Sequence, residues 1–397
     1  IQRVARGVYE ITLKGSTFLS LNASLVLDIE KNYGRYHQSS SSIHRDRFHQ
    51  YHSISSIQDS NPYLNSTHFE IIPGDNSFIS GLIAICESNG LQIDGVLLSA
   101  VIGMCFINCI SIEQANVFHQ YQNVVKLDLC RNLEYIGLKF LTYYEERAFP
   151  YLSEDFTLDD FSRAKIIFKL IREELDKTQG PLMIFGMKTN GFSLVMGTEG
   201  NNYIIGQLEP GKKISYVKSR FDDFDRIPFL CVIIPKEFAV KSGKIKIEYS
   251  KIFNNAVKLA SGDFEVSDGE YNGVAIYNAF QLLIKEMVIY DSSLQKEKMS
   301  QFRSLIKYYL VMKSNATIFL QNLVTEFHRT SQEFLISSAA QLYHKIAENF
   351  QILWEVLGNF QKDTNEFDFD HYKQLLEDSK ELELKAIKFL KDCTYYW

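Results

Sequence analysis

The spacing of apolar residues changes near Gly269, and this change constrains the fold more than any other feature of the chain. Before it, between residues 181 and 234, short apolar runs are separated by Gly, Asn and Thr, which is typical of strands joined by hairpins. After it, apolar residues recur every three or four positions, which is the period of an amphipathic helix. The sequence therefore predicts an α+β protein with a C-terminal helical bundle.

The same patterns predict the individual elements. Strands are expected at 68–72, 181–186, 191–197, 202–206 and 229–234. Helices are expected at 78–89 and 157–177, with an apolar core stretch at 95–110. Short polar breaks divide the helical region into five segments, at 273–290, 297–313, 314–330, 331–358 and 368–393.

The first 67 residues differ from the rest of the chain. An apolar helix is expected at about 18–33, and a polar linker rich in Ser, His, Gln and Asn follows it. The histidines of this linker are irregularly spaced, so they are interpreted as loop side chains and no metal site is predicted: His37, His44, His49 and His52. We therefore expect an N-terminal helix and linker (1–67), a compact α/β domain (68–268) and a helical bundle domain (269–397).

Composition excludes several classes of function. With 46% hydrophobic residues among 397, the chain can bury a large core. Its net charge of −6 provides no broad basic surface for nucleic acid, and no apolar run reaches the roughly 18–20 residues that span a bilayer. The six cysteines lie in apolar surroundings without zinc-ligand spacing, which predicts reduced, buried thiols in a cytoplasmic protein.

The segment from Phe78 to Asp94 carries the most chemical information. A turn at 73–77 leads into a helix that is expected to begin at Phe78, and Ser80 lies on its first turn. A helix N-terminus supplies unpaired N–H groups and a partial positive charge, and papain-like enzymes carry their nucleophile there. Three interpretations of Ser80 stay open: a helix cap, a catalytic or acyl-accepting serine, or a replacement of Cys.

Cys86 is the rival nucleophile on the same helix. It lies at apolar spacing from Leu82 and Ile83, and buried cysteines usually act as small hydrophobic residues. The adjacent Glu87 would raise the pKa of the thiol and so lower its reactivity. We therefore expect Cys86 to be a core residue.

The order of these parts resembles the family typified by butirosin biosynthesis protein H, which includes the petrobactin assembly protein AsbE. The resemblance covers roughly residues 68–390 and rests on several short motifs. They are Gly90-Leu-Gln-Ile-Asp94, Pro181-Leu-Met-Ile-Phe185, Gly191-Phe-Ser-Leu-Val-Met-Gly197, Gln207-Leu-Glu-Pro210, Gly273-Val-Ala-Ile-Tyr-Asn-Ala279, Phe302-Arg303 with Tyr309-Leu310, and Leu353-Trp354.

This resemblance implies a papain-like domain fused to a helical domain, and an acyltransferase activity. An acyl group would pass from a carrier-protein thioester to an amine or to water, in nonribosomal peptide, polyketide or siderophore biosynthesis. The chain departs from the family pattern where it matters most, because Ser80 replaces the catalytic Cys and Ile79 the preceding His. Gly191 or Asn190 stands in place of the hairpin His, and Glu209 in place of the Asp.

The resemblance thus assigns catalysis to Ser80, Asn190 and Glu209. Ser80 would accept the acyl group, the first amides of the helix would form an oxyanion hole, and Glu209 would orient the base. It implies no cofactor or metal.

The implied partner is an acyl or peptidyl carrier protein. It would dock on a basic patch formed by Lys212, Lys213, Lys218 and Arg220, although lysines there are equally typical of strand edges. The alternative is a non-catalytic family member that binds a carrier protein or a partner enzyme. A homodimer formed through the helical region is also compatible with the sequence.

Overall fold

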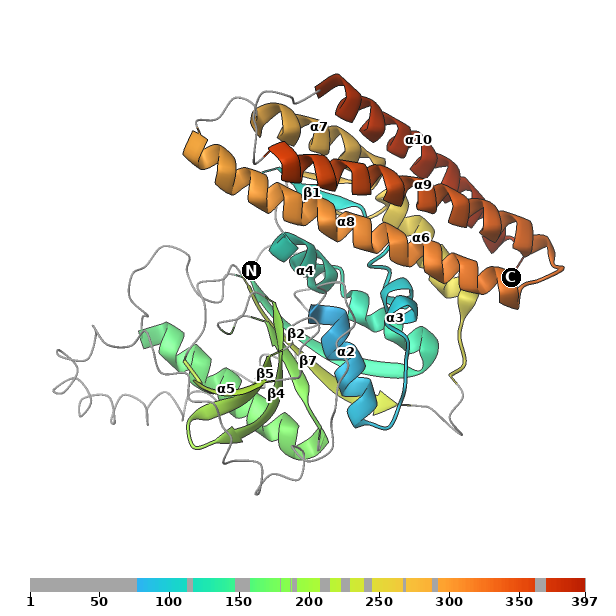
Figure 1. The fold of residues 1–397 in the computed structure, drawn as a ribbon. Helices are drawn as coiled ribbons and strands as arrows, with labels where there is room; N and C mark the ends of the chain where they lie inside the picture. Colours follow the sequence, from blue (N-terminus) through green and yellow to red (C-terminus); the bar gives the residue numbers. More distant parts are fainter. Residues whose placement is uncertain are drawn as a thin grey trace, which may run out of the picture.

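A six-stranded antiparallel sheet forms the lower half of the molecule (Figure 1). Its order is β2-β7-β3-β4-β5-β6, and every neighbouring pair is antiparallel. The strands are β2 (Leu138–Glu146), β3 (Leu182–Phe185), β4 (Phe192–Glu199), β5 (Asn202–Gln207), β6 (Ser215–Arg220) and β7 (Phe229–Phe238). The computed structural model describes residues 77–112, 117–146, 158–178, 180–185, 187, 191–207, 215–222, 229–238, 245–266, 269–287, 292–360 and 369–396. The expected helix at 18–33, the linker and the strand at 68–72 lie outside them.

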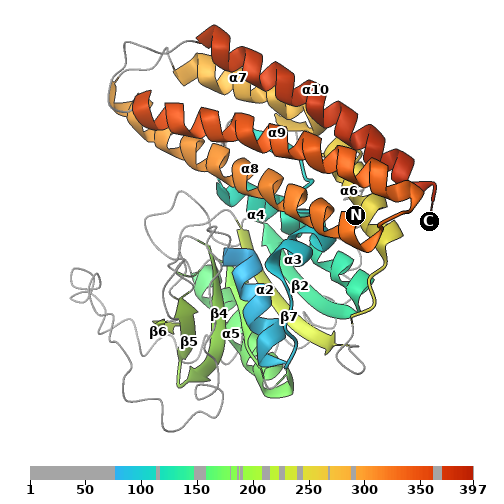
Figure 2. The same cartoon turned by 45° about the vertical axis from the view of Figure 1, so that its right-hand side comes forward.

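Helices cover both faces of this sheet. Side chains of a strand alternate between faces, so Leu182 and Ile184 of β3 pack against α5 (Leu158–Thr178). Met183 and Phe185 point to the opposite face, where α2 (Ser77–Ser88) lies (Figure 2). Burial on both faces explains why the sequence shows continuous apolar runs here in place of a simple polar and apolar alternation.

The upper half is helical and confirms the expected bundle (Figure 1). Long helices run side by side, and residues 327–330 make only a short connection between α8 and α9, which favours antiparallel neighbours. The bundle helices are α6 (Tyr249–Ser261), α7 (Ile276–Met287), α8 (Ser292–Glu326), α9 (Ser331–Phe360) and α10 (Phe369–Thr394). None of the described helices is long and apolar enough to cross a membrane.

The expected break between residues 313 and 314 is wrong, because α8 runs through it without interruption. Hydroxyl groups near this point are satisfied within the helix: Ser314 donates to the Leu310 carbonyl and Thr317 to the Lys313 carbonyl. The Lys313 side chain is fully buried in an ion pair with Glu383. The polar residues that suggested a break therefore make internal contacts of the bundle.

Smaller elements fill the space between sheet and bundle. A two-stranded antiparallel sheet pairs β1 with β8, which lies beyond Gly269 where only helix was expected. One hydrophobic core continues from α2 to α10, across the boundary predicted at 268 and 269, and that division stays a prediction. These elements are α3 (Gly95–Ile102), β1 (Cys109–Ser111), α4 (Val117–Lys126), η1 (Leu129–Ile136), β8 (Glu270–Asn272) and η2 (Gly273–Ala275).

Candidate functional site

The predicted site lies at the N-terminal end of α2, which packs against β3 and β4 (Figure 2). The helix begins at Ser77, so Ser80 is its fourth residue and is partly buried. The interpretation of Ser80 as a helix cap is therefore wrong, because a cap residue precedes the first helical residue. Ser77 is the first residue of α2, three positions before Ser80, to which the resemblance assigns the nucleophile.

The hydroxyl of Ser77 holds the helix to the sheet. Its Oγ accepts a hydrogen bond of 2.9 Å from the backbone N–H of Phe192, at the start of β4. A Cβ atom on Gly191 would lie only 2.3 Å from this Oγ and 3.1 Å from the Ser77 Cβ. No larger residue fits at position 191 unless the serine and its hydrogen bond move. The Ser77 side chain thus takes the space that a side chain at position 191 would need, and Asn190, the other position to which the resemblance assigns the hairpin His, lies outside the described residues.

Apolar contacts close the rest of this junction. The rings of Phe78 and Phe192 meet edge to face with centroids 5.1 Å apart. A Cβ on Gly81 would lie 2.8 Å from the Met183 Sδ, so the helix approaches β3 closely. Ile79, which replaces the family's His, is 7% exposed. The first turn of α2 is therefore tightly packed against the sheet.

The structure does not test how the other predicted site residues lie relative to Ser80. Asn190 and Glu209 lie outside the described residues, as do Lys212 and Lys213. The two described cations of the expected docking patch have carboxylate partners. Lys218 pairs with Glu199 at 2.7 Å, and Arg220 makes two hydrogen bonds of 2.9 Å to Asp222.

The cysteines behave as expected. All six are free and buried. Cys86 is completely buried, and burial, followed by the nearby charge of Glu87, raises the pKa of its thiol to about 12. A thiol with that pKa is protonated at neutral pH, so Cys86 is a core residue and not a nucleophile.

Metal binding finds no support in the part of the chain that the structure describes. Among those residues, no group of three or more His, Cys, Asp or Glu side chains is arranged to hold an ion. The four linker histidines, His37, His44, His49 and His52, lie outside it.

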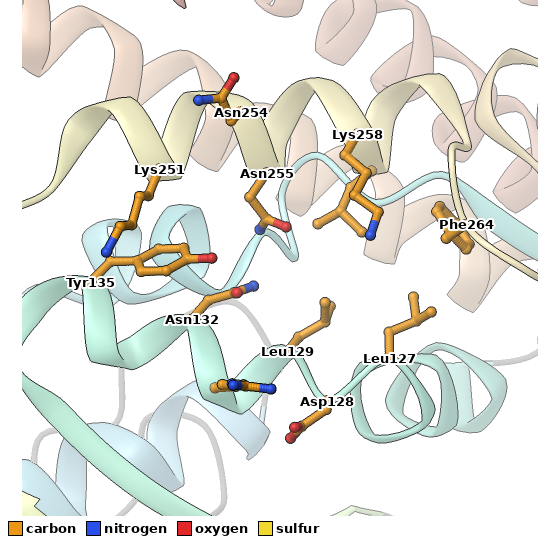
Figure 3. Close-up of a pocket in the computed structure, with 12 residues that line it drawn as sticks. Leu127, Asp128, Leu129, Asn132, Tyr135, Lys251, Asn254, Asn255, Lys258 and Phe264 are labelled. Carbon is orange, nitrogen blue, oxygen red and sulfur yellow. The ribbon is translucent and has the colours of Figure 1, made fainter. Parts of the chain in front are cut away.

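A second region was not found by sequence reasoning. A pocket with a volume of about 430 Å³ lies between η1 and α6 (Figure 3). Its sequence signal is a polar stripe on one face of α6, with Lys251, Asn255 and Lys258 at positions i, i+4 and i+7. The stripe is recognisable only once the segment is taken as a helix.

No protein-family model matches this chain, and no curated protein matches it.

Proposed function

We propose that this chain is a non-catalytic binding protein with a papain-like layout, which engages an acyl or peptidyl carrier protein or a partner enzyme of natural-product biosynthesis. The contact between Ser77 and Gly191 carries the proposal. Ser77 lies on the same helix turn as Ser80, to which the resemblance assigns the nucleophile, and its side chain takes the space that a base at position 191 would need.

The chemistry of that contact opposes catalysis. A serine hydroxyl becomes nucleophilic when a neighbouring base accepts its proton. The Ser77 oxygen accepts a hydrogen bond from the Phe192 amide, and among the described residues its hydroxyl makes no hydrogen bond to a base. A histidine at position 191 would require this serine to be displaced. The helix start is thus used to fix α2 on the sheet.

The test uses an octanoyl-loaded acyl carrier protein as the probe. We expect saturable binding in biolayer interferometry, no release of octanoate and no octanoyl adduct in intact mass spectra. The Ser80→Ala variant should bind as the wild type does. Turnover or a covalent adduct would contradict the non-catalytic role, and the absence of saturable binding would contradict the carrier as partner.

Acyl transfer through Ser80 is the second candidate. It is favoured by one observation, the partly exposed position of Ser80 on the first turn of α2, where helix amides lie free of intrahelical partners. Ser80 would accept the acyl group, and Glu209 would orient the base, as the resemblance implies.

This candidate makes a distinct prediction. Ser80→Ala should abolish octanoate release, whereas Ser88→Ala, in the last position of the same helix, should leave it unchanged. Ser80→Cys should increase release, because a thiol depends less on a base than a hydroxyl does. Equal rates for Ser80→Ala and Ser88→Ala would rule out Ser80 as the acyl acceptor.

A further inference from the structure

The pocket between η1 and α6 has an unusual backbone. Its lower wall is η1, a 3₁₀ helix of eight residues, whereas such helices rarely exceed three or four. Asp128 precedes it in the left-handed conformation, at φ 49° and ψ 40°, and its carboxylate makes no capping hydrogen bond. The tight turn at Asp128 brings Leu127 to the wall of the pocket (Figure 3).

The two walls are fixed to each other. The Glu248 amide at the start of α6 donates to the Tyr135 carbonyl near the end of η1 at 3.0 Å. The side-chain amides of Asn132 and Asn255, one from each wall, both donate to the Ile102 carbonyl, at 2.9 and 3.4 Å. The pocket is therefore held open by hydrogen bonds, and a ligand need not order it.

Cations dominate its charge. Arg131, Lys251 and Lys258 line the pocket together with one carboxylate, that of Asp128. The ammonium of Lys251 is shared with Glu248 at 2.5 Å and lies 5.5 Å from the centre of the Tyr135 ring. Among the described residues, the side chains of Arg131 and Lys258 have no hydrogen-bond or ion-pair partner. In a chain of net charge −6, this is a local excess of positive charge.

An apolar side faces these cations. Leu129 and Leu259 are only 4% and 2% exposed, and Leu127 and Phe264 pack beside them. Figure 3 shows the Lys258 ammonium directed into the space above Leu127 and Leu129. Pockets for small molecules have volumes from about 300 to 1,000 Å³. The cavity here, about 430 Å³, lies within that range.

We propose that this pocket binds a small amphiphilic organic anion, whose charged head meets Arg131 and Lys258 and whose short apolar tail lies against Leu129 and Leu259. The head is a carboxylate, phosphate or sulfonate, since all three accept hydrogen bonds from Arg and Lys. The pocket contains no residue of the α2 junction, so this inference goes beyond the proposed function, and either can fail alone.

The test is calorimetric titration of the full chain with hexanesulfonate, which stays anionic at all pH values of interest. We expect saturable binding, and at least tenfold weaker binding by the double variant Arg131→Gln/Lys258→Gln. The matched control is Lys285→Gln, an exposed cation on α7 away from the pocket, which should bind as the wild type does. Hexanoate and hexyl phosphate replace the probe to rank the three head groups.

Three results would overturn the proposal. One is no saturable binding of any of the three anions. Another is unchanged affinity in the double variant. The third is an affinity for inorganic sulfate or for hexanol equal to that for hexanesulfonate, because sulfate lacks the apolar tail and hexanol lacks the charge.

A second measurement avoids dependence on variants. A hexanesulfonate analogue with a photoreactive diazirine at its tail is irradiated with the wild-type protein, and the labelled peptides are sequenced by mass spectrometry. We expect label within residues 127–135 or 251–264, and a loss of label when excess hexanesulfonate is present. Label confined to other segments would place the site elsewhere.

Discussion

Two groups of charged and polar residues in this molecule are built in opposite ways. Inside the bundle, Lys313 of α8 and Glu383 of α10 form an ion pair at 2.9 Å with no exposed side-chain surface. At the pocket, Arg131 and Lys258 are exposed, and among the described residues neither side chain makes a hydrogen bond or ion pair, although the Arg131 charge is near enough to oppose the rise in the pKa of Asp128. The first group is complete, and the second has unused hydrogen-bond donors.

The contacts of the buried group account for each of its charged groups. The ammonium of Lys313 donates to the Glu383 Oε1 and the Asn108 Oδ1, each at 2.9 Å, and it lies 2.9 Å from the Glu383 Oε2 in the ion pair. Glu383 also accepts the hydroxyls of Tyr277 at 2.8 Å and Tyr343 at 3.0 Å. The ammonium and both carboxylate oxygens therefore all have partners within the chain.

The comparison separates structural from functional charge. The buried group joins α7, α8, α9 and α10 to the segment before β1, and every charge in it is compensated by the chain itself. The pocket offers charge beside apolar surface, with its walls already fixed. We therefore expect substitutions in the first region to change stability and substitutions in the second to change binding.

The largest effect is expected for Glu383→Ala. It leaves the Lys313 ammonium buried without its counter-ion and two tyrosine hydroxyls without an acceptor, so the free energy of unfolding should fall by about 3–5 kcal/mol. Urea denaturation measures the loss. Glu381→Ala, at an exposed position of the same helix, is the matched control and should change stability by less than about 0.5 kcal/mol.

The double variant Lys313→Met/Glu383→Leu sharpens this test. Replacing both charges by apolar residues removes the uncompensated ion, so it should recover part of the stability that Glu383→Ala loses. A Glu383→Ala variant within about 1 kcal/mol of the wild type would contradict the structural role of the pair.

The next effect concerns Gly103, which lies beside the pocket at φ 95°. A Cβ there would come within 2.2 Å of the Leu259 Cδ1 and 2.7 Å of the Asn255 Nδ2, so Gly103→Ala should displace both pocket residues. We expect a loss of about 1–3 kcal/mol in unfolding free energy and weaker hexanesulfonate binding.

Gly90→Ala provides the control for backbone strain alone. Gly90 has a similar φ of 74°, but nothing lies within 4 Å of the added Cβ. It should lose less stability than Gly103→Ala and keep the wild-type affinity. Equal losses of stability in the two variants would show that steric overlap with Leu259 and Asn255 does not contribute to the loss in Gly103→Ala.

A smaller effect on stability is expected for Lys258→Gln. The side chain is exposed and has no hydrogen-bond or ion-pair partner among the described residues, so the free energy of unfolding should stay within about 0.5 kcal/mol of the wild type. Hexanesulfonate binding should nevertheless weaken several-fold, as calorimetry would measure. A Lys258→Gln variant that loses stability and keeps its affinity would mean that Lys258 stabilises the fold, as Lys313 does, and does not bind the anion.

Local patterns were sufficient to predict four of the described strands, β3, β4, β5 and β7, and the helices α2, α5, α7, α8, α9 and α10, whereas β1, β2, β6, β8, α4 and α6 were not predicted. The helix at α2 begins one residue before the expected Phe78, and β3, β4 and β5 match the predicted apolar runs closely. These elements are fixed by their own apolar periodicity and by nearby turn residues. The predicted bounds agree best with the structure for elements whose sequence pattern lies within a single segment.

Long-range contacts could not be predicted in this way. The polar residues at 313 and 314 suggested a helix break, because the partner that stabilises Lys313 inside α8 is Glu383, 70 residues away. The pocket likewise depends on η1 lying against α6, a helix that was not predicted. Ser77 and Phe192 are 115 residues apart in the sequence. The position of the helix start against β4 could therefore not be predicted from local patterns.

The smallest predicted effect is a gain of affinity at Asp128. Burial raises the pKa of this carboxyl, an effect that Arg131 opposes and Glu134 reinforces. Above that pKa the carboxylate is charged and repels an anion in the pocket, so hexanesulfonate affinity should decrease as the pH rises through it. Asp128→Asn removes the charge, and Asn also tolerates the left-handed backbone at this position. We therefore expect a few-fold tighter binding at neutral pH and a weaker dependence on pH, measured by titration between pH 4 and 8. Tighter binding without any change in the pH profile would show that Asp128 is not the titrating group, because the neutral amide leaves no proton to exchange there.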